Sequence, residues 1–530
     1  MRDPREFVDS IVTDLQPLET AANLAWWEAA VTGAADAYRR VEQCRNRIDR
    51  LYARPGLFEG LAAAREEGVD DSLLARRIEL LYLEALPRQV DDTLSRRINR
   101  LAAESERAFA TFRPLFQGRR VSANDLDRVL KEELDEDLRR EAWEALKSVG
   151  PILVDDLREL VGLRNRAARQ VGFPDFYAMR LSLQEQDPES LYRLLDTLDD
   201  LSREPYLETK SRVDAALAER FGRSAERLQP WHYADQFFQE VPDVFGADLD
   251  RVYTDVDLPA VAERFYEGIG LHVSEVLARS SLHEADGKDP HAFATDIDRR
   301  GDVRILLNLR RNERWMGTTL HELGHAVYDL GIERSLPWDL RRPAHILVTE
   351  AIAMLFGRLS RDAAWMRDMG VVDAASAERL AAATSAEITA TMRVVTRWIM
   401  VMAHFERGLY ADPDQDLQTL WWDLVERFQG VARPERPRGA ADYAAKIHIV
   451  VAPIYYHNYL LGECLASQID GRLREEALDG AASYAGEPAI GPWLQERIFR
   501  PGARVHYDAL AEDATGGPVG PEAFAAQFLG

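Results

Sequence analysis

The sequence predicts a predominantly α-helical fold with one small β element. Long stretches rich in Ala, Leu, Glu and Arg carry apolar residues three and four positions apart, as at Leu80, Leu81, Leu83 and Leu86. Short breaks that contain Pro or Gly separate these stretches, at Pro87, Gly150-Pro151, Gly172 to Pro174 and Pro230. One region has a different period and gives the β element.

The β element is predicted between residues 291 and 309. Apolar residues recur at positions 303, 305, 307 and 309, which is the two-residue period of a strand. Residues 291–296 are a plausible partner strand, and Asp298-Arg299-Arg300-Gly301 between them is a plausible hairpin turn. This small sheet leads directly into the segment with the strongest chemical motif.

Composition and charge exclude several classes of protein. The chain has 530 residues and a formal charge of −24, which repels phosphate backbones and argues against nucleic acid as a partner. The first residues lack the apolar stretch of a secretory signal, and the sequence has no apolar run of 18 residues that would cross a bilayer. We therefore expect a cytoplasmic protein without a membrane anchor. Its oligomeric state is not predicted.

Residues 321–325 read His-Glu-Leu-Gly-His. On a helix, residues four apart lie on one face, so the imidazoles of His321 and His325 can reach one metal ion. Glu322 points to one side, where its carboxylate can hold a water on that ion. The alternative is a surface helix with two solvated histidines. Apolar flanking residues predict burial and disfavour it: Met316, Leu320, Leu323, Ala326 and Val327.

Glu350 is the best candidate for a third metal ligand. If residues 346–355 form a helix, positions 346, 347, 350, 351, 354 and 355 share a face that is apolar except for Glu350. A lone carboxylate on such a face needs a partner, and a metal ion is a suitable one. Asp329, Glu333 and Asp339 are alternatives, but they lie near or within a polar turn, where solvated acids are common.

This ligand set predicts zinc as the cofactor. Two imidazoles and a carboxylate leave zinc Lewis-acidic with one open position, although cobalt or manganese can bind the same ligands. The ion lowers the pKa of its water and polarises a carbonyl, while Glu322 removes the proton and passes it to the leaving amine. The predicted reaction is amide hydrolysis without a covalent intermediate.

A second cluster of polar and aromatic residues lies at 446–459, which read Lys-Ile-His-Ile-Val-Val-Ala-Pro-Ile-Tyr-Tyr-His-Asn-Tyr. Hydrolysis of a peptide builds an oxyanion beside the zinc, and His and Tyr side chains are suitable donors to it. The residues alone equally allow an interior helix end in which these side chains satisfy local hydrogen bonds.

The order of these motifs resembles the angiotensin-converting-enzyme family of zinc peptidases. The likeness rests on His291-Ala292-Phe293-Ala294, the His-Glu-Leu-Gly-His motif, Glu350-Ala351, Lys446-x-His448 and Tyr456-x-x-Tyr459. Weaker likeness at residues 160–165 and 26–30 extends it over most of the chain. Members of the family are dipeptidyl carboxypeptidases, and related helical oligopeptidases and carboxypeptidases share their fold.

The resemblance implies roles for the residues in the second cluster. His448 and Tyr459 would stabilise the tetrahedral intermediate, and Lys446 and Tyr456 would hold the terminal carboxylate of the substrate. The spacing from His448 to the tyrosines is one residue longer than in the best-known members, so Tyr455 is an alternative in this alignment.

The resemblance also implies that the predicted sheet binds substrate. His291 would orient the peptide, and the backbone of Ala292 and Ala294 would pair with it as an added strand, which suits an edge strand with open N–H and C=O groups. Where the family has a Gln against the substrate carboxylate, this chain offers Asp235, an anion that would repel the carboxylate unless Lys446 neutralises it.

Two further positions depart from the family pattern. Asn458 stands where the family has the Arg that is tied to chloride activation, so chloride dependence through that position is not expected. Met354 stands where the family has an acidic residue four positions after the glutamate ligand. A partner for a zinc-binding histidine must therefore come from elsewhere.

The resemblance implies two helical halves that form a clamshell around a deep channel, with the small sheet beside the zinc. We expect residues 1–530 to form one catalytic unit, with 1–120 as part of a helical lid and 288–460 as the zinc-site and substrate-binding core. The expected substrates are short peptides, cut by release of C-terminal dipeptides. Alternatives are an internally cleaving oligopeptidase or a carboxypeptidase of the same fold, a zinc hydrolase for a non-peptide amide, and a peptide-binding protein without catalysis.

Overall fold

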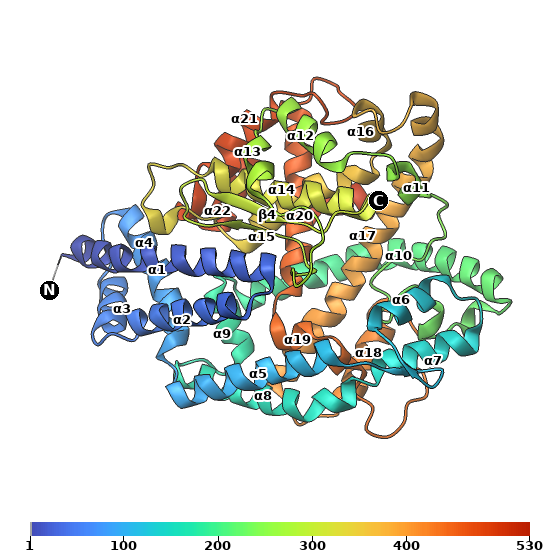
Figure 1. The fold of residues 1–530 in the computed structure, drawn as a ribbon, viewed down its shortest axis with the longest axis horizontal. Helices are drawn as coiled ribbons and strands as arrows, with labels where there is room; N and C mark the ends of the chain where they lie inside the picture. Colours follow the sequence, from blue (N-terminus) through green and yellow to red (C-terminus); the bar gives the residue numbers. More distant parts are fainter. Residues whose placement is uncertain (1–2) are drawn as a thin grey trace. The chain divides into compact units, whose positions relative to one another are not determined.

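The computed structural model describes residues 3–530 and is mainly helical, as the sequence predicts (Figure 1). Two short antiparallel hairpins are the β structure within the described part of the chain. The described residues form two compact units. Unit 1 contains residues 3–89, 247–385 and 461–524, and unit 2 contains residues 90–246, 386–460 and 525–530.

Unit 1 contains the predicted metal motif and the predicted sheet. Its elements are α1 (Pro4–Thr32), α2 (Ala35–Tyr52), α3 (Leu57–Glu67), α4 (Ser72–Ala85), α11 (Leu249–Tyr253), α12 (Leu258–Gly268), α13 (Ser274–Arg279), β3 (Phe293–Asp296), β4 (Val303–Leu306), α14 (Glu313–Gly331), α15 (Ile346–Gly357), α16 (Ala363–Asp368), α21 (Ile490–Leu494) and α22 (Tyr507–Thr515).

Unit 2 contains the predicted second cluster. Its elements are α5 (Asp92–Thr111), β1 (Leu115–Phe116), β2 (Arg119–Arg120), α6 (Ala123–Glu132), α7 (Glu136–Lys147), α8 (Gly150–Gln170), α9 (Phe176–Leu183), α10 (Pro188–Phe221), α18 (Leu417–Gln429) and α19 (His448–Val451). Three helices contribute residues to both units: α17 (Ala374–Ala411), α20 (Tyr456–Glu476) and α23 (Glu522–Phe528).

The predicted β element is present and shorter than expected. β3 pairs with β4 in antiparallel register, with Ala294 opposite Ile305. The turn between them contains Arg299 and Gly301, both with positive φ (57° and 116°). Beyond β4, the backbone N–H groups of Leu307 and Leu309 donate to Ser281 O (2.8 Å) and Leu282 O (3.0 Å). The extended segment therefore continues past β4, but there it bonds to residues 281–282 and not to β3.

The hairpin β1–β2 was not predicted. Gln117 and Gly118 form its turn, with φ of 50° and 71°. Each strand has two residues, which is too short for a two-residue period to stand out from the flanking helices.

The N-terminal helices pack around one hydrophobic cluster of unit 1. Buried side chains of α1 to α4, among them Ile11, Leu51, Leu61 and Ile78, meet there with Trp338. Next to this cluster, Trp27 of α1 packs on Leu306 and Phe293 of the hairpin. In this way α1 covers the sheet that lies beside the metal motif.

Within residues 3–530 we find no helix with the length and apolar character needed to span a membrane.

Candidate metal centre and substrate-binding groups

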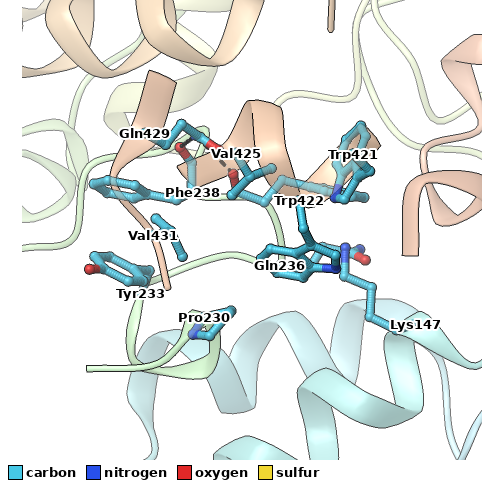
Figure 2. Close-up of a pocket in the computed structure, with 11 residues that line it drawn as sticks. Lys147, Pro230, Tyr233, Gln236, Phe238, Trp421, Trp422, Val425, Gln429 and Val431 are labelled. Carbon is cyan, nitrogen blue, oxygen red and sulfur yellow. Dashed lines mark hydrogen bonds between the residues drawn. The ribbon is translucent and has the colours of Figure 1, made fainter. Parts of the chain in front are cut away.

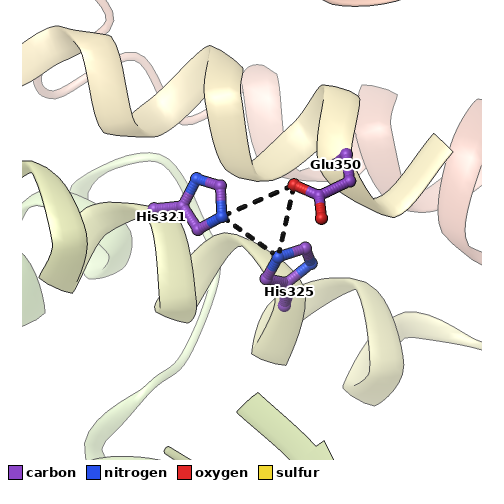
Figure 3. A group of neighbouring side chains, drawn as sticks. All are labelled: His321, His325 and Glu350. Carbon is purple, nitrogen blue, oxygen red and sulfur yellow. Dashed lines mark hydrogen bonds and ion pairs between the residues drawn. The ribbon is translucent and has the colours of Figure 1, made fainter. Parts of the chain in front are cut away.

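Helices α14 and α15 lie side by side and carry the predicted metal ligands (Figure 3). Asn312 caps α14 by accepting the N–H of Trp315 (3.0 Å), and His345 caps α15 by accepting the N–H of Leu347 (3.0 Å). Gly324, inside the His-Glu-Leu-Gly-His motif, lies at their contact. A Cβ atom on Gly324 would stand 2.9 Å from Ala353 Cα, so the absence of a side chain permits the close approach.

The structure brings His321, His325 and Glu350 together (Figure 3). The Nε2 atoms of the two histidines are 3.2 Å apart, and Glu350 Oε2 lies 3.6 Å from His321 Nε2 and 3.9 Å from His325 Nε2. Around a tetrahedral zinc ion with bonds of about 2.0–2.2 Å, ligand atoms stand about 3.4 Å apart. The three atoms therefore fit one zinc ion at their centre.

Burial keeps both imidazoles in the form that binds metal. It lowers the pKa of His321 to about 4, and it lowers the pKa of His325 well below the usual value, with a smaller contribution from His321. A neutral imidazole presents a lone pair to a metal ion, so neither histidine must lose a proton at neutral pH before it binds.

Thr349 supplies a partner for one histidine. Its Oγ1 lies 2.7 Å from Nδ1 of His325, which leaves Nε2 of that ring facing Glu350. The sequence predicted that such a partner must come from a residue other than Met354, and it did not identify Thr349. No local feature of the sequence identifies this contact, because it joins two different helices.

The alternatives for the third ligand lie elsewhere. Asp339 is buried and accepts two bonds from Arg77 Nε (2.9 and 3.1 Å). Glu333 pairs with Arg500 at 3.2 Å. Asp329 is placed near Asp296, since the charge of Asp296 adds to the larger effect of burial and raises the pKa of Asp329 to about 8. None of these three is in the group formed by the two imidazoles and Glu350.

Glu322 is buried beside this group. Burial, followed by the charge of Glu350, raises the pKa of Glu322 to about 8, and a hydrogen bond from the backbone N–H of Ala294 opposes the shift. The structure thus joins the proposed base to strand β3. A carboxyl with a raised pKa is suited to hold a proton during proton transfer near neutral pH.

The outer edge of β3 carries the backbone groups predicted to bind a peptide. Ile305, opposite Ala294, directs its N–H and C=O to Ser280 and Ser281 (2.8 and 3.1 Å), away from β3. Ala294 therefore forms a non-hydrogen-bonded pair, and its own backbone groups point to the outer edge. His291 lies in the bend before the strand with its side chain 88% exposed, 3.3 Å from Asp289.

In unit 2, Lys446 is buried and donates to Gln239 Oε1 (2.8 Å). Its Nζ also lies 5.4 Å from the ring centre of Tyr456. Burial lowers the pKa of Lys446 to about 8, and the charges of Asp235 and Glu240 oppose this shift. The amide side chain next to Lys446 is therefore that of Gln239, which the sequence did not single out.

Asp235 is buried and hydrogen-bonded within its own loop. Its carboxylate accepts the backbone N–H groups of Phe237 (2.8 Å), Gln239 (3.0 Å) and Glu240 (2.9 Å). Burial raises its pKa to about 6. Because these bonds engage the carboxylate with its own loop, Asp235 shapes the segment that carries Gln239.

His448, Tyr456 and Tyr459 form an aromatic group in unit 2. The rings of His448 and Tyr456 have centres 5.2 Å apart, and those of Tyr456 and Tyr459 have centres 5.8 Å apart. Tyr456 is the first residue of α20, so Tyr459 lies one turn along the same helix. The alternative, Tyr455, also contacts Tyr459, with ring centres 5.1 Å apart.

A cavity in unit 2 is lined mainly by aromatic and other apolar side chains, with Lys147 at one side (Figure 2). None of the predicted site residues lines it. Lys147 Nζ lies 3.4 Å from the ring centre of Phe237, and Lys446 Nζ lies 5.2 Å from the centre of the same ring. Phe237, one of the residues that line this cavity, therefore lies next to both lysines.

Helical architecture with a His-Glu-Leu-Gly-His helix and a glutamate on the next helix defines a metallopeptidase type of site. Comparison with known proteins agrees. Residues 234–483 match the sequence model of a peptidase family described as angiotensin-converting enzyme. Carboxypeptidase 1 of Bacillus subtilis (strain 168) is 23% identical over 252 residues, which cover 43% of this chain and 49% of that protein.

These comparisons confirm the resemblance predicted from the sequence over residues 234–483. The matched segment contains every predicted site residue from Asp235 to Tyr459, including the group of His321, His325 and Glu350. The chain spans about half the length of the curated relative that it matches. The weaker likeness at 26–30 and 160–165 lies outside the matched residues and stays a prediction.

Proposed function

We propose that this protein is a zinc-dependent peptidase that releases dipeptides from the C-terminus of short peptides. The observation that carries the proposal is the convergence of two imidazole nitrogens and one carboxylate oxygen within 3.9 Å of one another. Glu322 lies beside them and is bonded to the edge strand β3. His321, His325 and Glu350 would hold the ion.

Each group beside the ion has a proposed task. A zinc ion held there would act as a Lewis acid on the scissile carbonyl and on the attacking water. Glu322 takes a proton from that water and delivers it to the leaving amine nitrogen. His448 and Tyr459 donate hydrogen bonds to the oxygen that gains negative charge in the transition state.

Strand β3 is the proposed docking edge for the peptide. Ala292 and Ala294 offer backbone groups to an extended chain, and His291 orients it. Because the N–H of Ala294 already donates to Glu322, the C=O of Ala294 and the groups of Ala292 are the ones left for the substrate. Binding a peptide at this edge therefore places its backbone beside the base.

Recognition of a free C-terminus is proposed for Lys446, Tyr456 and Gln239. An ammonium group, a phenol and an amide can together bind a carboxylate by charge and hydrogen bonds. Asp235 contributes by holding the loop of Gln239. Similarity to a protein named Carboxypeptidase 1 supports cleavage near the C-terminus.

The wider architecture is proposed from the resemblance. Residues 1–530 would act as one cytoplasmic catalytic unit, a clamshell of two helical halves around a substrate channel. Residues 1–120 would form part of a lid that admits short unfolded peptides, and residues 288–460 would form the zinc-site and substrate-binding core.

Mass spectrometry of products from matched peptides tests the proposal. The zinc-loaded protein is incubated with one peptide as the free acid and as the C-terminal amide. We expect dipeptides from the free acid and little cleavage of the amide. Release of single residues identifies a carboxypeptidase, and equal internal cleavage of both peptides identifies an oligopeptidase.

Two further outcomes would reject peptide hydrolysis altogether. If peptides bind but stay intact with zinc bound, the protein is a peptide-binding protein. If peptides neither bind nor break while simple acyl amides are hydrolysed, the substrate is a non-peptide amide. A chelator should stop hydrolysis and added zinc should restore it, because the ligands belong to one ion.

A further inference from the structure

The segment that joins His448 to Tyr459 contains a strained residue. Ile454 has φ of +58°, in the left-handed region that β-branched side chains rarely adopt. It lies between the end of α19 and the start of α20. It falls in the interval where the spacing is one residue longer than the resemblance predicts. A backbone in this conformation persists only when its surroundings hold it there.

Both peptide groups of Ile454 are held by side chains of other elements of unit 2. Its N–H donates to Glu406 Oε1 of α17 at 2.8 Å, and its C=O accepts from Gln184 Nε2, directly after α9, at 3.2 Å. Gln184 also accepts the side-chain N–H of Asn458 at 2.7 Å, and Asn458 is the neighbour of Tyr459. Two side chains thus fix the turn and the first residues of α20.

Glu406 is an unusual choice of residue for a purely structural contact. Its side chain is buried, and burial raises its pKa to about 8 against the opposing effects of the Ile454 N–H, Arg164 and Arg180. Burying a carboxyl costs free energy that an apolar residue of the same size would not cost. The bond to the strained turn is the specific interaction that Glu406 provides.

The other end of the segment is also held by a side chain of unit 2. Arg164 of α8 donates to the C=O of Ile449 (3.1 Å) and to the C=O of Val450 (2.6 Å), one and two residues after His448. With that end anchored, the left-handed turn at Ile454 determines where the chain enters α20. A change of φ there would move Tyr459 relative to His448.

We infer that Glu406 and Gln184 are positioning residues that hold Ile454 in its left-handed conformation and so set the placement of His448 and Tyr459 for catalysis. This inference rests on the proposed function, in which His448 and Tyr459 stabilise the transition state of peptide hydrolysis. It predicts that removal of the acceptor at position 406 affects turnover more than substrate binding, since the two catalytic groups act on the transition state.

The test compares Glu406→Leu with Glu406→Gln in the zinc-loaded full chain. Gln keeps an oxygen that can accept the Ile454 N–H, and Leu has none of that kind. We expect kcat to fall about 10- to 100-fold in Glu406→Leu, with KM changed less than about threefold, because small misplacement of catalytic groups has effects of this size. Glu406→Gln should stay within about threefold of the wild type.

Hydrogen–deuterium exchange of residues 448–459 gives a readout that does not depend on activity. Exchange should quicken in Glu406→Leu and stay slow in Glu406→Gln. If Glu406→Leu does not fold, Gln184→Leu replaces it and should show the same fall in kcat with faster exchange. Wild-type kcat in the Leu variant, or an equal loss in the Gln variant, overturns the inference. A wild-type protein that cleaves no peptide rejects the proposed function, and the exchange comparison still decides whether Glu406 holds the turn.

Discussion

Nδ1 of His325 lies 2.7 Å from the hydroxyl oxygen of Thr349, the residue directly before Glu350. When Nε2 binds a metal ion the ring carries its proton on Nδ1, and Oγ1 can accept that proton in a hydrogen bond. Nε2 is then the lone-pair nitrogen, and it is the atom that faces Glu350. Helix α15 therefore contributes both a proposed ligand and the group that orients a ligand of α14.

Replacing Thr349 with Val should weaken metal binding while preserving the shape of the site. We expect a loss of about 10- to 100-fold in zinc affinity, the usual effect of removing a hydrogen-bond partner from a metal-binding histidine. Titration of zinc against a competing chelator measures it. Thr349→Ser keeps the hydroxyl and should stay near the wild type. Equal affinities of the Val and Ser variants would show that the hydroxyl does not orient His325.

Glu322→Gln should separate catalysis from metal binding. Gln has the same shape and can still accept the Ala294 N–H, but it cannot take a proton from water. We expect kcat to fall about 10²- to 10⁴-fold, the range for loss of a general base. Zinc content, measured by mass spectrometry of the metal, should remain that of the wild type because Glu322 is outside the ligand group. Hydrolysis at the wild-type rate would require another base.

Local sequence was sufficient for the features that depend on helical period. His321 and His325 share a helix face because they are four apart, and Glu350 interrupts the apolar face of the next helix. The two helices were expected to lie close together because a buried Glu350 needs a partner, and a metal ion bound by the two histidines provides one. The structure brings these three residues together as those arguments predicted.

Features that depend on tertiary contacts could not be predicted in this way. Nothing near Thr349 in the sequence shows that its hydroxyl meets His325, and Gln239 meets Lys446 across more than 200 positions of sequence. Ile454 gives no sign of a positive φ, because that conformation opposes the preference of a β-branched residue and is imposed by Glu406 and Gln184.

Gly324→Ala should separate the two helices that carry the proposed ligands. The new Cβ would stand 2.9 Å from Ala353 Cα and 3.2 Å from Ile352 O, both backbone atoms that cannot turn aside. We expect a loss of about 1–3 kcal/mol in the free energy of unfolding of the metal-free protein, the range for overpacking. Zinc affinity should fall as well, because the ligands come from both helices.

Gly162→Ala is the matched control for this change. Gly162 is an exposed residue inside α8, and a Cβ there would meet no atom within 4 Å. Ala is favoured over Gly in a helix by up to about 1 kcal/mol, so this variant should be as stable as the wild type or more stable. Denaturant unfolding measures the free energy of unfolding of both variants. A Gly324→Ala protein as stable as Gly162→Ala would show that α14 and α15 do not depend on this contact.

The buried Lys446 should make substrate binding depend on pH, but only for peptides that have a free C-terminal carboxylate. Burial lowers its pKa to about 8, so the amine is charged below that pH and increasingly neutral above it. A charged amine attracts a carboxylate, so KM for free-acid peptides should rise above pH 8, up to about tenfold per pH unit. KM for any amidated peptide that is cleaved should not show this rise.

The stability of the protein should increase over the pH range in which substrate binding weakens. The folded pKa of Lys446 is lower than that of an unfolded lysine, so between about pH 8 and 10.5 the unfolded chain binds more protons. The contribution of Lys446 to the free energy of unfolding therefore rises with pH across that window.

Lys446→Met should lose both the rise of KM and the rise of stability, since Met fills the same space without a titrating group. We would measure KM and the unfolding free energy of both proteins from pH 7 to 10. A rise of KM that persists in Lys446→Met would assign the titration to another group and remove Lys446 from the carboxylate site.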